Sequence, residues 1–192
     1  MTGTLDPIDV ALLVTVALDR LGVLHTVGGS IASSISGEPR STIDIDIVAA
    51  LEVRHVKPLV EALAPLFYID ADALSRAVAE RRSVNLIHHD TQVKVDLFVA
   101  GGTPLDALQL SRRREVDLHG RRIFVHPPED ILLQKLRWFR AGGETSDRQW
   151  RDVVGIVRVQ GARLDRSYLK AQAEILQVTD LLEQALDDGS TS

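Results

Sequence analysis

The chain has 192 residues, of which 45% are hydrophobic and 26% are charged, and its formal net charge is −5. These proportions are ordinary for a globular domain, and the negative charge argues against nucleic-acid binding through bulk charge. The absence of cysteine excludes a disulfide framework and a thiolate metal site. The longest apolar run, residues 10–18, is too short to span a bilayer, so we expect a cytoplasmic protein that makes no membrane contact.

Predicted helices and strands alternate over the first two thirds of the chain. The patterns predict helices over residues 6–21, 30–36, 53–64, 71–80 and from Thr103 onward, and strands over residues 23–27, 42–48 and 66–69. Two further segments, residues 83–100 and 114–125, each read as a β-hairpin. This order predicts a mixed α/β domain over residues 1–126.

The composition changes after the second hairpin. A helix with proline at its start and glycine at its end covers residues 127–143, and everything after it has helical patterning. We therefore expect a C-terminal helical region over residues 127–188 and a disordered tail over residues 189–192.

The segment "TIDIDIV" carries the first chemical signal. Side chains alternate faces along a strand, so Asp44 and Asp46 share one face while the isoleucines supply the core on the other. Two carboxylates about 7 Å apart at their Cα atoms repel each other unless a cation lies between them. Mg²⁺ and Mn²⁺ prefer such oxygen ligands, which predicts a metal site; a solvated strand face is the alternative.

Three neighbouring features favour the metal site. Gly28, Gly29 and Ser30 lie between a strand and a helix, where backbone N–H groups and a hydroxyl attract phosphate. Asp96 lies on a later predicted strand and offers a third carboxylate. Arg40, just before the aspartates, offers a planar cation for anionic groups.

These features together resemble the signature of the DNA polymerase beta-like nucleotidyltransferase superfamily. The match consists of the glycine turn ending at Ser30, the D-x-D strand of Asp44 and Asp46 after thirteen intervening residues, and the later strand carboxylate Asp96. The resemblance implies an α/β (α+β) fold, a mixed sheet flanked by helices. It also implies a nucleoside triphosphate bound through two divalent metal ions.

Within the superfamily, the chain is similar to small bacterial nucleotidyltransferase toxins of abortive-infection and toxin–antitoxin systems. The shared patterns are the run R-x-T-x-D-I-D, here Arg40, Thr42, Asp44 and Asp46, and a P-E-D…K helix, here Pro128, Glu129, Asp130 and Lys135. A later aspartate follows on the next helix, and we choose Asp152 for it.

The neighbours of Lys135 support a role for it independently of the resemblance. The residues three and four positions away are all apolar, so the ammonium must either extend to water or meet a buried anion. The helical neighbours of Asp152 are partly polar and partly apolar. A solvated aspartate that pairs with Arg148 therefore explains this position nearly as well as a site residue does.

The resemblance implies in-line attack of an acceptor hydroxyl on the α-phosphate. Asp44 and Asp46 would hold both metals, and Asp96 would complete the acceptor-side metal and take the hydroxyl proton. Ser30, Arg40 and the glycine amides would bind phosphates, with Lys135 compensating developing charge. In related toxins a kinase antitoxin phosphorylates a residue at the position of Thr42; a threonine that simply suits a strand is the alternative.

The sequence leaves open which molecule would receive the transferred nucleotide. The resemblance points to tRNA 3′ ends, with a cognate antitoxin as partner, while antibiotics and protein hydroxyls serve elsewhere in the superfamily. Five arginines around the second hairpin could contact an RNA backbone, although a solvated surface explains them as well.

Three other classes compete with a nucleotidyltransferase. A sugar-nucleotide glycosyltransferase also uses D-x-D but leaves the glycine turn unexplained. A haloacid-dehalogenase-type phosphatase places its D-x-D near the chain start with threonine after it, whereas Ile47 follows Asp46 here. A catalytically inactive nucleotide-binding module usually lacks one carboxylate, and all three are present.

Overall fold

A computed structural model of the chain describes residues 5–38, 44–101, 104–118 and 120–190. The predicted site residues Arg40 and Thr42 lie outside this part, and so do the predicted cap Thr103 and the turn residue His119. The side chain of Asp44 also lies outside it, whereas its backbone belongs to a described strand.

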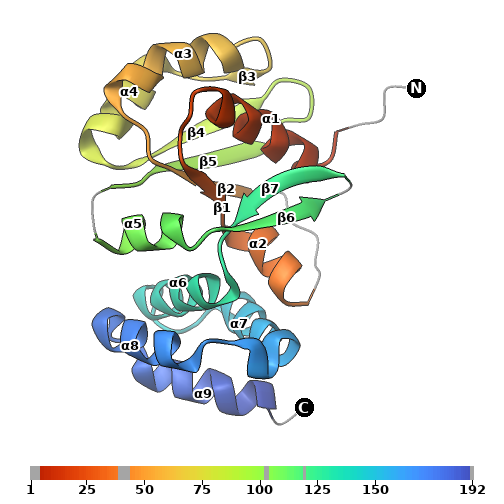
Figure 1. The fold of residues 1–192 in the computed structure, drawn as a ribbon, viewed down its shortest axis with the longest axis vertical. Coiled ribbons are helices and arrows are strands. Elements are labelled where there is room, and N and C mark those ends of the chain that lie inside the picture. Colours follow the sequence, from red (N-terminus) through yellow and green to blue (C-terminus); the bar gives the residue numbers. More distant parts are fainter. Residues whose placement is uncertain (1–4, 39–43, 102–103, 119, 191–192) are drawn as a thin grey trace. The chain divides into compact units, whose positions relative to one another are not determined.

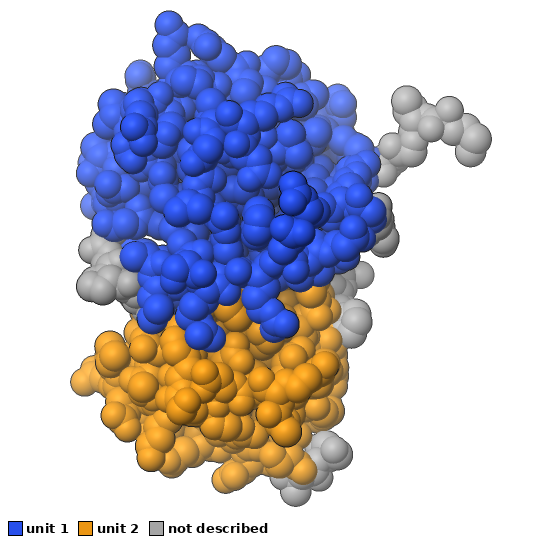
Figure 2. Space-filling model, in the orientation of Figure 1, with its two compact units in different colours: residues 1–31, 41–126 blue, residues 32–40, 127–192 orange. Residues whose placement is uncertain are grey.

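The chain divides into two compact units, residues 1–31 with 41–126 and residues 32–40 with 127–192 (Figure 2). The first unit contains the helices α1 (Pro7–Arg20), α3 (Val53–Leu63), α4 (Ala71–Glu80) and α5 (Pro104–Ser111), and α2 (Gly29–Ser36) begins in it. Its strands are β1 (His25–Val27), β2 (Asp44–Ala49), β3 (Phe67–Tyr68), β4 (Ser83–His88), β5 (Lys94–Val99), β6 (Arg114–Leu118) and β7 (Arg121–Val125). These elements confirm the predicted order of helices and strands.

The strands form one mixed sheet, seven-stranded in the described part of the chain, in the order β3-β4-β5-β2-β1-β7-β6 (Figure 1). Strand β2 pairs in parallel with β5, strand β1 pairs in parallel with β7, and the other pairs are antiparallel. The helix α1 packs against β2 and α3, and α4 packs against α3 and β4.

The alternation predicted for the D-x-D strand is present and places the core. Ile45 and Ile47 on β2, with Val95 and Leu97 on β5, are completely buried. The residues between them are only half-buried, so one face of the central strands builds the core and the other carries the polar side chains.

The start of α1 follows the predicted chemistry. The Asp6 carboxylate accepts a hydrogen bond of 2.8 Å from the Asp9 backbone N–H, and the Asp9 carboxylate accepts one of 3.2 Å from the Asp6 N–H. Pro7 occupies the first helical position, where a backbone N–H would have no hydrogen-bond partner within the helix, so proline costs nothing there. None of the described helices is long and apolar enough to cross a bilayer.

The second unit is helical. It contains α6 (Pro128–Ala141), α7 (Asp147–Gln160), a short 3₁₀ turn, η1 (Gly161–Arg163), α8 (Arg166–Leu176) and α9 (Thr179–Ser190). The helix α7 packs against both α6 and α9, and α8 packs against α6 and α9.

Two boundaries differ from the sequence prediction. Residues 32–40 group with the helical unit, because Glu38 pairs with Arg158 and the backbone of Ser36 accepts a hydrogen bond from Gln160. The tail expected from residue 189 is helical as far as Ser190, since Gly189 is buried against Val157 of α7.

A buried histidine follows β7. His126 is 1% exposed, and neither of its ring nitrogens has a hydrogen-bond partner among the described residues. Burial disfavours the charged imidazolium and lowers the pKa of His126 to about 4. Burial likewise lowers the pKa of His25, whose Nδ1 lies 3.0 Å from the Val23 carbonyl oxygen.

Because His126 is buried in its neutral form, we expect the free energy of unfolding to decrease in acid. The unfolded chain binds the proton of His126 near pH 6.5 and the folded chain only near pH 4, so stability is lost as the pH falls between these values. We expect a loss of about 3 kcal/mol that levels off below pH 4. Urea unfolding from pH 7.5 to 4 should show a shallower loss in His126→Met, while exposed His89→Met should match the unsubstituted protein. Equal slopes in all three would contradict this assignment.

Candidate functional site

The parallel pairing of β2 and β5 brings the predicted carboxylates together. Asp46 stands opposite Asp96 in the register, so their Cα atoms are about 5 Å apart on neighbouring strands. Asp44 stands opposite Lys94 in the same pairing. Asp96 is 19% exposed in its side chain and lies on the face that the core leaves open.

The glycine turn lies directly against Asp46. The Gly28 backbone N–H donates a 2.8 Å hydrogen bond to the Asp46 carbonyl oxygen. Gly29 has a φ of +54°, and a Cβ added to it would lie 1.7 Å from Asp46 Oδ2. Only a residue without a side chain leaves room for this carboxylate, which explains why glycine begins α2.

Ser30 follows within the first turn of α2 and is 8% exposed. The first backbone N–H groups of a helix have no intrahelical partner, and they carry the positive end of the helix dipole. The structure therefore places Gly28 and Gly29 against Asp46 at one end of β1, with Ser30 next in the chain.

A lysine belongs to the same row of side chains. Lys94 lies two residues before Asp96 on β5, and its ammonium nitrogen is 2.9 Å from Asp96 Oδ2. The Lys94 side chain is 43% exposed. Asn85 of β4 stands opposite Asp96 on the other side and is exposed.

Lys94 and Asn85 were not among the predicted site residues, although the sequence carries a signal for both. Strand parity places Lys94 on the same face as Asp96, because the two are two residues apart. The predicted hairpin over residues 83–100 brings β4 beside β5, and counting back from its turn places Asn85 near Asp96.

The donor set suits a hard divalent cation. Carboxylate oxygens from Asp46 and Asp96 on adjacent strands are the ligands that Mg²⁺ and Mn²⁺ prefer. Among the described side chains, which do not include that of Asp44, no group of three acidic or histidine residues gathers closely enough to hold a metal.

Lys135 and Asp152 form a buried ion pair within the helical unit. The Lys135 ammonium is 2.8 Å from Asp152 Oδ2 and 3.2 Å from Gln149 Oε1, which joins α6 to α7. Their side chains are only 8% and 9% exposed. The lysine therefore meets a buried anion, one of the two outcomes that its apolar neighbours predicted. Asp152 pairs with this lysine, whereas the sequence alternative was a solvated pair with Arg148.

The acidic residues of the P-E-D pattern also make contacts inside this unit. Glu129 accepts a 3.0 Å hydrogen bond from the backbone N–H of Asp165, and Asp130 accepts one from the Tyr168 hydroxyl. Both contacts fasten the start of α6 to the start of α8. They give this pattern a structural role in the described residues.

The arginine-rich hairpin β6–β7 makes several contacts within its own unit. Arg121 pairs with Asp9 at 3.1 Å and Arg122 with Glu115 at 3.6 Å. The guanidinium carbon of Arg113 lies 4.2 Å from the centre of the Phe124 ring. Arg121 and Arg122 are nevertheless exposed, so an RNA contact and a solvated surface both stay open for this hairpin.

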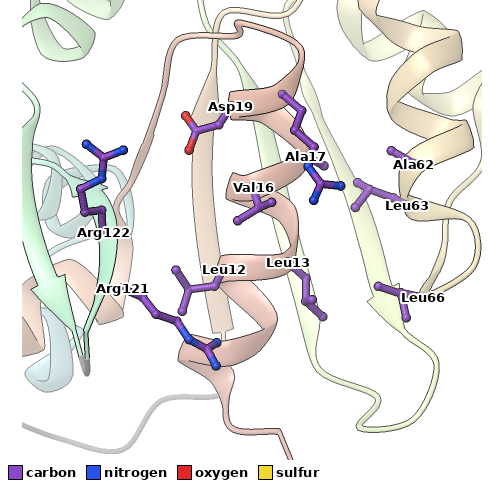
Figure 3. Close-up of a pocket in the computed structure, with 11 residues that line it drawn as sticks. Leu12, Leu13, Val16, Ala17, Asp19, Ala62, Leu63, Leu66, Arg121 and Arg122 are labelled. Carbon is purple, nitrogen blue, oxygen red and sulfur yellow. The ribbon is translucent and has the colours of Figure 1, made fainter.

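A hollow of about 530 Å³ lies beside α1 in the first unit. Figure 3 shows Leu12 and Val16 of α1 facing it, with Leu63 and Leu66 to one side and Arg121 on the hairpin. None of the predicted site residues that the structure describes is among its lining residues.

No protein-family model matches the chain, and no curated protein matches its sequence. Several solved structures match its fold. An antigenic nucleotidyltransferase-like protein from Paracoccidioides brasiliensis is 19% identical with a TM-score of 0.55, over 93% of this chain and 91% of its own.

Two antibiotic-related proteins of known structure match the chain with similar sequence identities and TM-scores. The antibiotic-resistance factor ANT(2'')-Ia, in complex with adenylyl-2''-tobramycin, is 12% identical with a TM-score of 0.58, over 88% of this chain and 95% of its own. The lincosamide antibiotic adenylyltransferase LnuA, bound to lincomycin, is 13% identical with a TM-score of 0.52, over 78% and 95%. At such identities the likeness is one of fold. The chain has the fold of nucleotidyltransferase-like proteins, a mixed sheet flanked by helices and followed by C-terminal helices, as predicted.

The contact between Gly29 and Asp46 predicts that alanine at position 29 lowers the free energy of unfolding more than alanine at another glycine with positive φ. Gly22 offers a matched control, because its φ is +67° but nothing lies within 4 Å of the position that a Cβ would take there. Gly22→Ala should lose about 1 kcal/mol of stability from the backbone alone. Gly29→Ala should lose about 1 kcal/mol more, since the Asp46 side chain must rotate away. Urea unfolding compares the two; equal losses would show that Asp46 does not occupy this gap.

The buried ion pair predicts strong coupling between its partners. Lys135→Met removes the ammonium that lies 2.8 Å from a buried carboxylate and should destabilise the protein by about 3 kcal/mol, and Asp152→Leu should do the same. The double variant should recover most of this loss because no buried charge remains. The exposed pair of Lys57 and Glu61, 3.8 Å apart, should couple by less than about 0.5 kcal/mol in a parallel double-mutant cycle. Additive losses at Lys135 and Asp152 would rule out the pairing.

Proposed function

We propose that the protein is a metal-dependent nucleotidyltransferase that moves a nucleoside monophosphate from a nucleoside triphosphate to an acceptor hydroxyl. The observation that carries this proposal is the contact between the glycine turn and Asp46, next to Asp96 in the strand register. It combines a phosphate-binding geometry with adjacent carboxylates in one place. The fold of nucleotidyltransferase-like proteins supports the same reaction class.

The metal-binding residues in this proposal are Asp44, Asp46 and Asp96. Bound Mg²⁺ or Mn²⁺ would polarise the phosphoryl oxygens and lower the pKa of the attacking hydroxyl. Asp44 and Asp46 would hold the ions together with the triphosphate. Asp96, on the neighbouring strand, would face the acceptor and accept its proton.

The phosphate-binding residues are those of the glycine turn. Gly28 and Gly29 have no side chains, so the outer phosphates could approach the first backbone N–H groups of α2, and the Ser30 hydroxyl adds a donor. Arg40 is proposed as a further phosphate ligand. Because the glycine turn is in place before substrate binds, its N–H groups would stabilise the charge that develops on pyrophosphate.

Lys135 and Asp152 enter the proposal as a pair. Asp152 holds the Lys135 ammonium at 2.8 Å, so it would orient that charge. A contact between Lys135 and the triphosphate rests on the sequence resemblance alone. Thr42 remains a proposed regulatory phosphorylation site on the same basis, since a phosphate there would add about two negative charges next to Asp44.

Of the three acceptor classes, tRNA, small molecules and protein hydroxyls, particular observations favour the first two. The run from Arg40 to Asp46 resembles that of toxins that modify tRNA 3′ ends, which would also imply a cognate antitoxin. The folds of an adenylyltransferase bound to lincomycin and of a factor bound to adenylyl-2''-tobramycin favour a small hydroxylated molecule instead. The side chains on the face of β2 and β5 that carries Asp46 and Asp96, here called the carboxylate row, lie on the side of the sheet opposite the core. This placement is compatible with either acceptor.

Transfer of label tests the proposal directly. Each α-³²P-labelled nucleoside triphosphate is incubated with Mg²⁺ or Mn²⁺ and with total bacterial RNA in one arm, or a panel of aminoglycosides and lincosamides in the other. With the unsubstituted protein, we expect label to be transferred to an acceptor in one of the two arms. Asp46→Asn should reduce transfer about a thousandfold, because several kcal/mol of charge stabilisation are lost.

Asp90→Asn is the matched control, since Asp90 is an exposed aspartate in the turn between β4 and β5. It should transfer label like the unsubstituted protein. Transfer that survives Asp46→Asn would reject the carboxylate assignment. Absence of label in every arm, with nucleotide binding retained, would leave a protein acceptor or a nucleotide-binding module as the two readings.

A further inference from the structure

The carboxylate row contains a cation of its own. The Lys94 ammonium lies 2.9 Å from Asp96 Oδ2, within the distance of a charge-assisted hydrogen bond. Lys94 also stands opposite Asp44 in the parallel register of β5 and β2. Its backbone is therefore next to both the first and the third aspartate of the predicted metal site.

The position of Lys94 is a consequence of strand geometry. Residues two apart on a strand share a face, so Lys94 and Asp96 must project to the same side of the sheet. The side chains between and beyond them, Val95 and Leu97, are completely buried on the other side. The ammonium cannot turn into that apolar core without leaving its charge unpaired, which confines it to the carboxylate face.

An ammonium and a divalent metal ion make incompatible demands on the same carboxylate. Both bind the oxygen lone pairs of Asp96, and two cations at one oxygen repel each other. A metal ion that binds Asp96 Oδ2 must therefore displace the Lys94 ammonium. The side chain can move, because it is 43% exposed and its ammonium regains water when it leaves.

We propose that Lys94 competes with a divalent metal ion for Asp96 and so sets the metal concentration at which the site is completed. This role rests on the proposed function only in its use of Asp96 as a metal ligand. Without metal, Lys94 relieves the repulsion between adjacent carboxylates. With metal, the ammonium withdraws and Asp96 becomes a ligand, so Lys94 is a positioning residue rather than a catalytic one.

Titration with Mn²⁺ alone tests the competition in the full chain. Electron paramagnetic resonance of unbound Mn²⁺ gives the affinity without any nucleotide transfer. Lys94→Met should bind Mn²⁺ about tenfold tighter than the unsubstituted protein, because the competing charge is gone. Lys94→Arg keeps the charge and should stay within about twofold of the original affinity.

Two further variants assign the effect to Asp96. The gain should vanish in Lys94→Met combined with Asp96→Asn, since the contested ligand is then removed. Lys57→Met removes an exposed lysine from α3 and should leave Mn²⁺ binding unchanged. Circular dichroism confirms that each variant is folded before titration.

Three results would overturn the competition. They are an affinity that is unchanged or weaker in Lys94→Met, a gain that persists without the Asp96 carboxylate, and the absence of Mn²⁺ binding in both the unsubstituted protein and Lys94→Met. These readouts do not depend on transfer. Tighter Mn²⁺ binding in Lys94→Met without any labelled product would support the competition while counting against transfer to RNA or a small molecule, and labelled product with unchanged Mn²⁺ affinity would do the reverse.

Discussion

The parallel pairing of β2 with β5 is the constraint on which the candidate site depends. This pairing puts Asp46 opposite Asp96 and Asp44 opposite Lys94, and it buries Ile45 and Ile47 at the same time. The side-chain period of a strand is two residues, so a slip by one residue would send the aspartates into the core and the isoleucines to water. The hydrophobic effect that folds the sheet therefore also fixes the register of the carboxylates.

The surroundings of these carboxylates solve two physical problems. Space is the first, and Gly29 solves it, because any side chain there would meet the Asp46 carboxylate. Charge is the second, because adjacent aspartates repel, and the Lys94 ammonium balances one of them at 2.9 Å. Both residues are explained by the presence of the carboxylate row, and neither is needed by the apolar core. A face with adjacent carboxylates that folds without a bound cation requires features of this kind.

The helical unit uses its buried charges differently. Lys135 and Asp152 neutralise each other between α6 and α7, while Glu129 and Asp130 fasten α6 to α8. Buried charges are tolerated only when they are paired and hydrogen-bonded, and here each of them has a partner in its own unit. A pattern that resembles a catalytic motif in sequence thus has a packing role that local contacts explain. Double-mutant coupling and label transfer measure the two roles separately.

The sequence by itself determined the elements and the two faces of the central strand. Alternating aspartate and isoleucine, the Asp6 cap of α1 and the turns of both hairpins are local signals, and short-range backbone sterics and hydrogen bonds act on them directly. It also located the glycine turn and Asp96, but not their distance from one another. Only the tertiary structure decided that β5 lies beside β2 in parallel, that Lys94 meets Asp96, and that Lys135 meets Asp152. These contacts join residues whose mutual approach depends on chain topology and core packing, which no local pattern encodes.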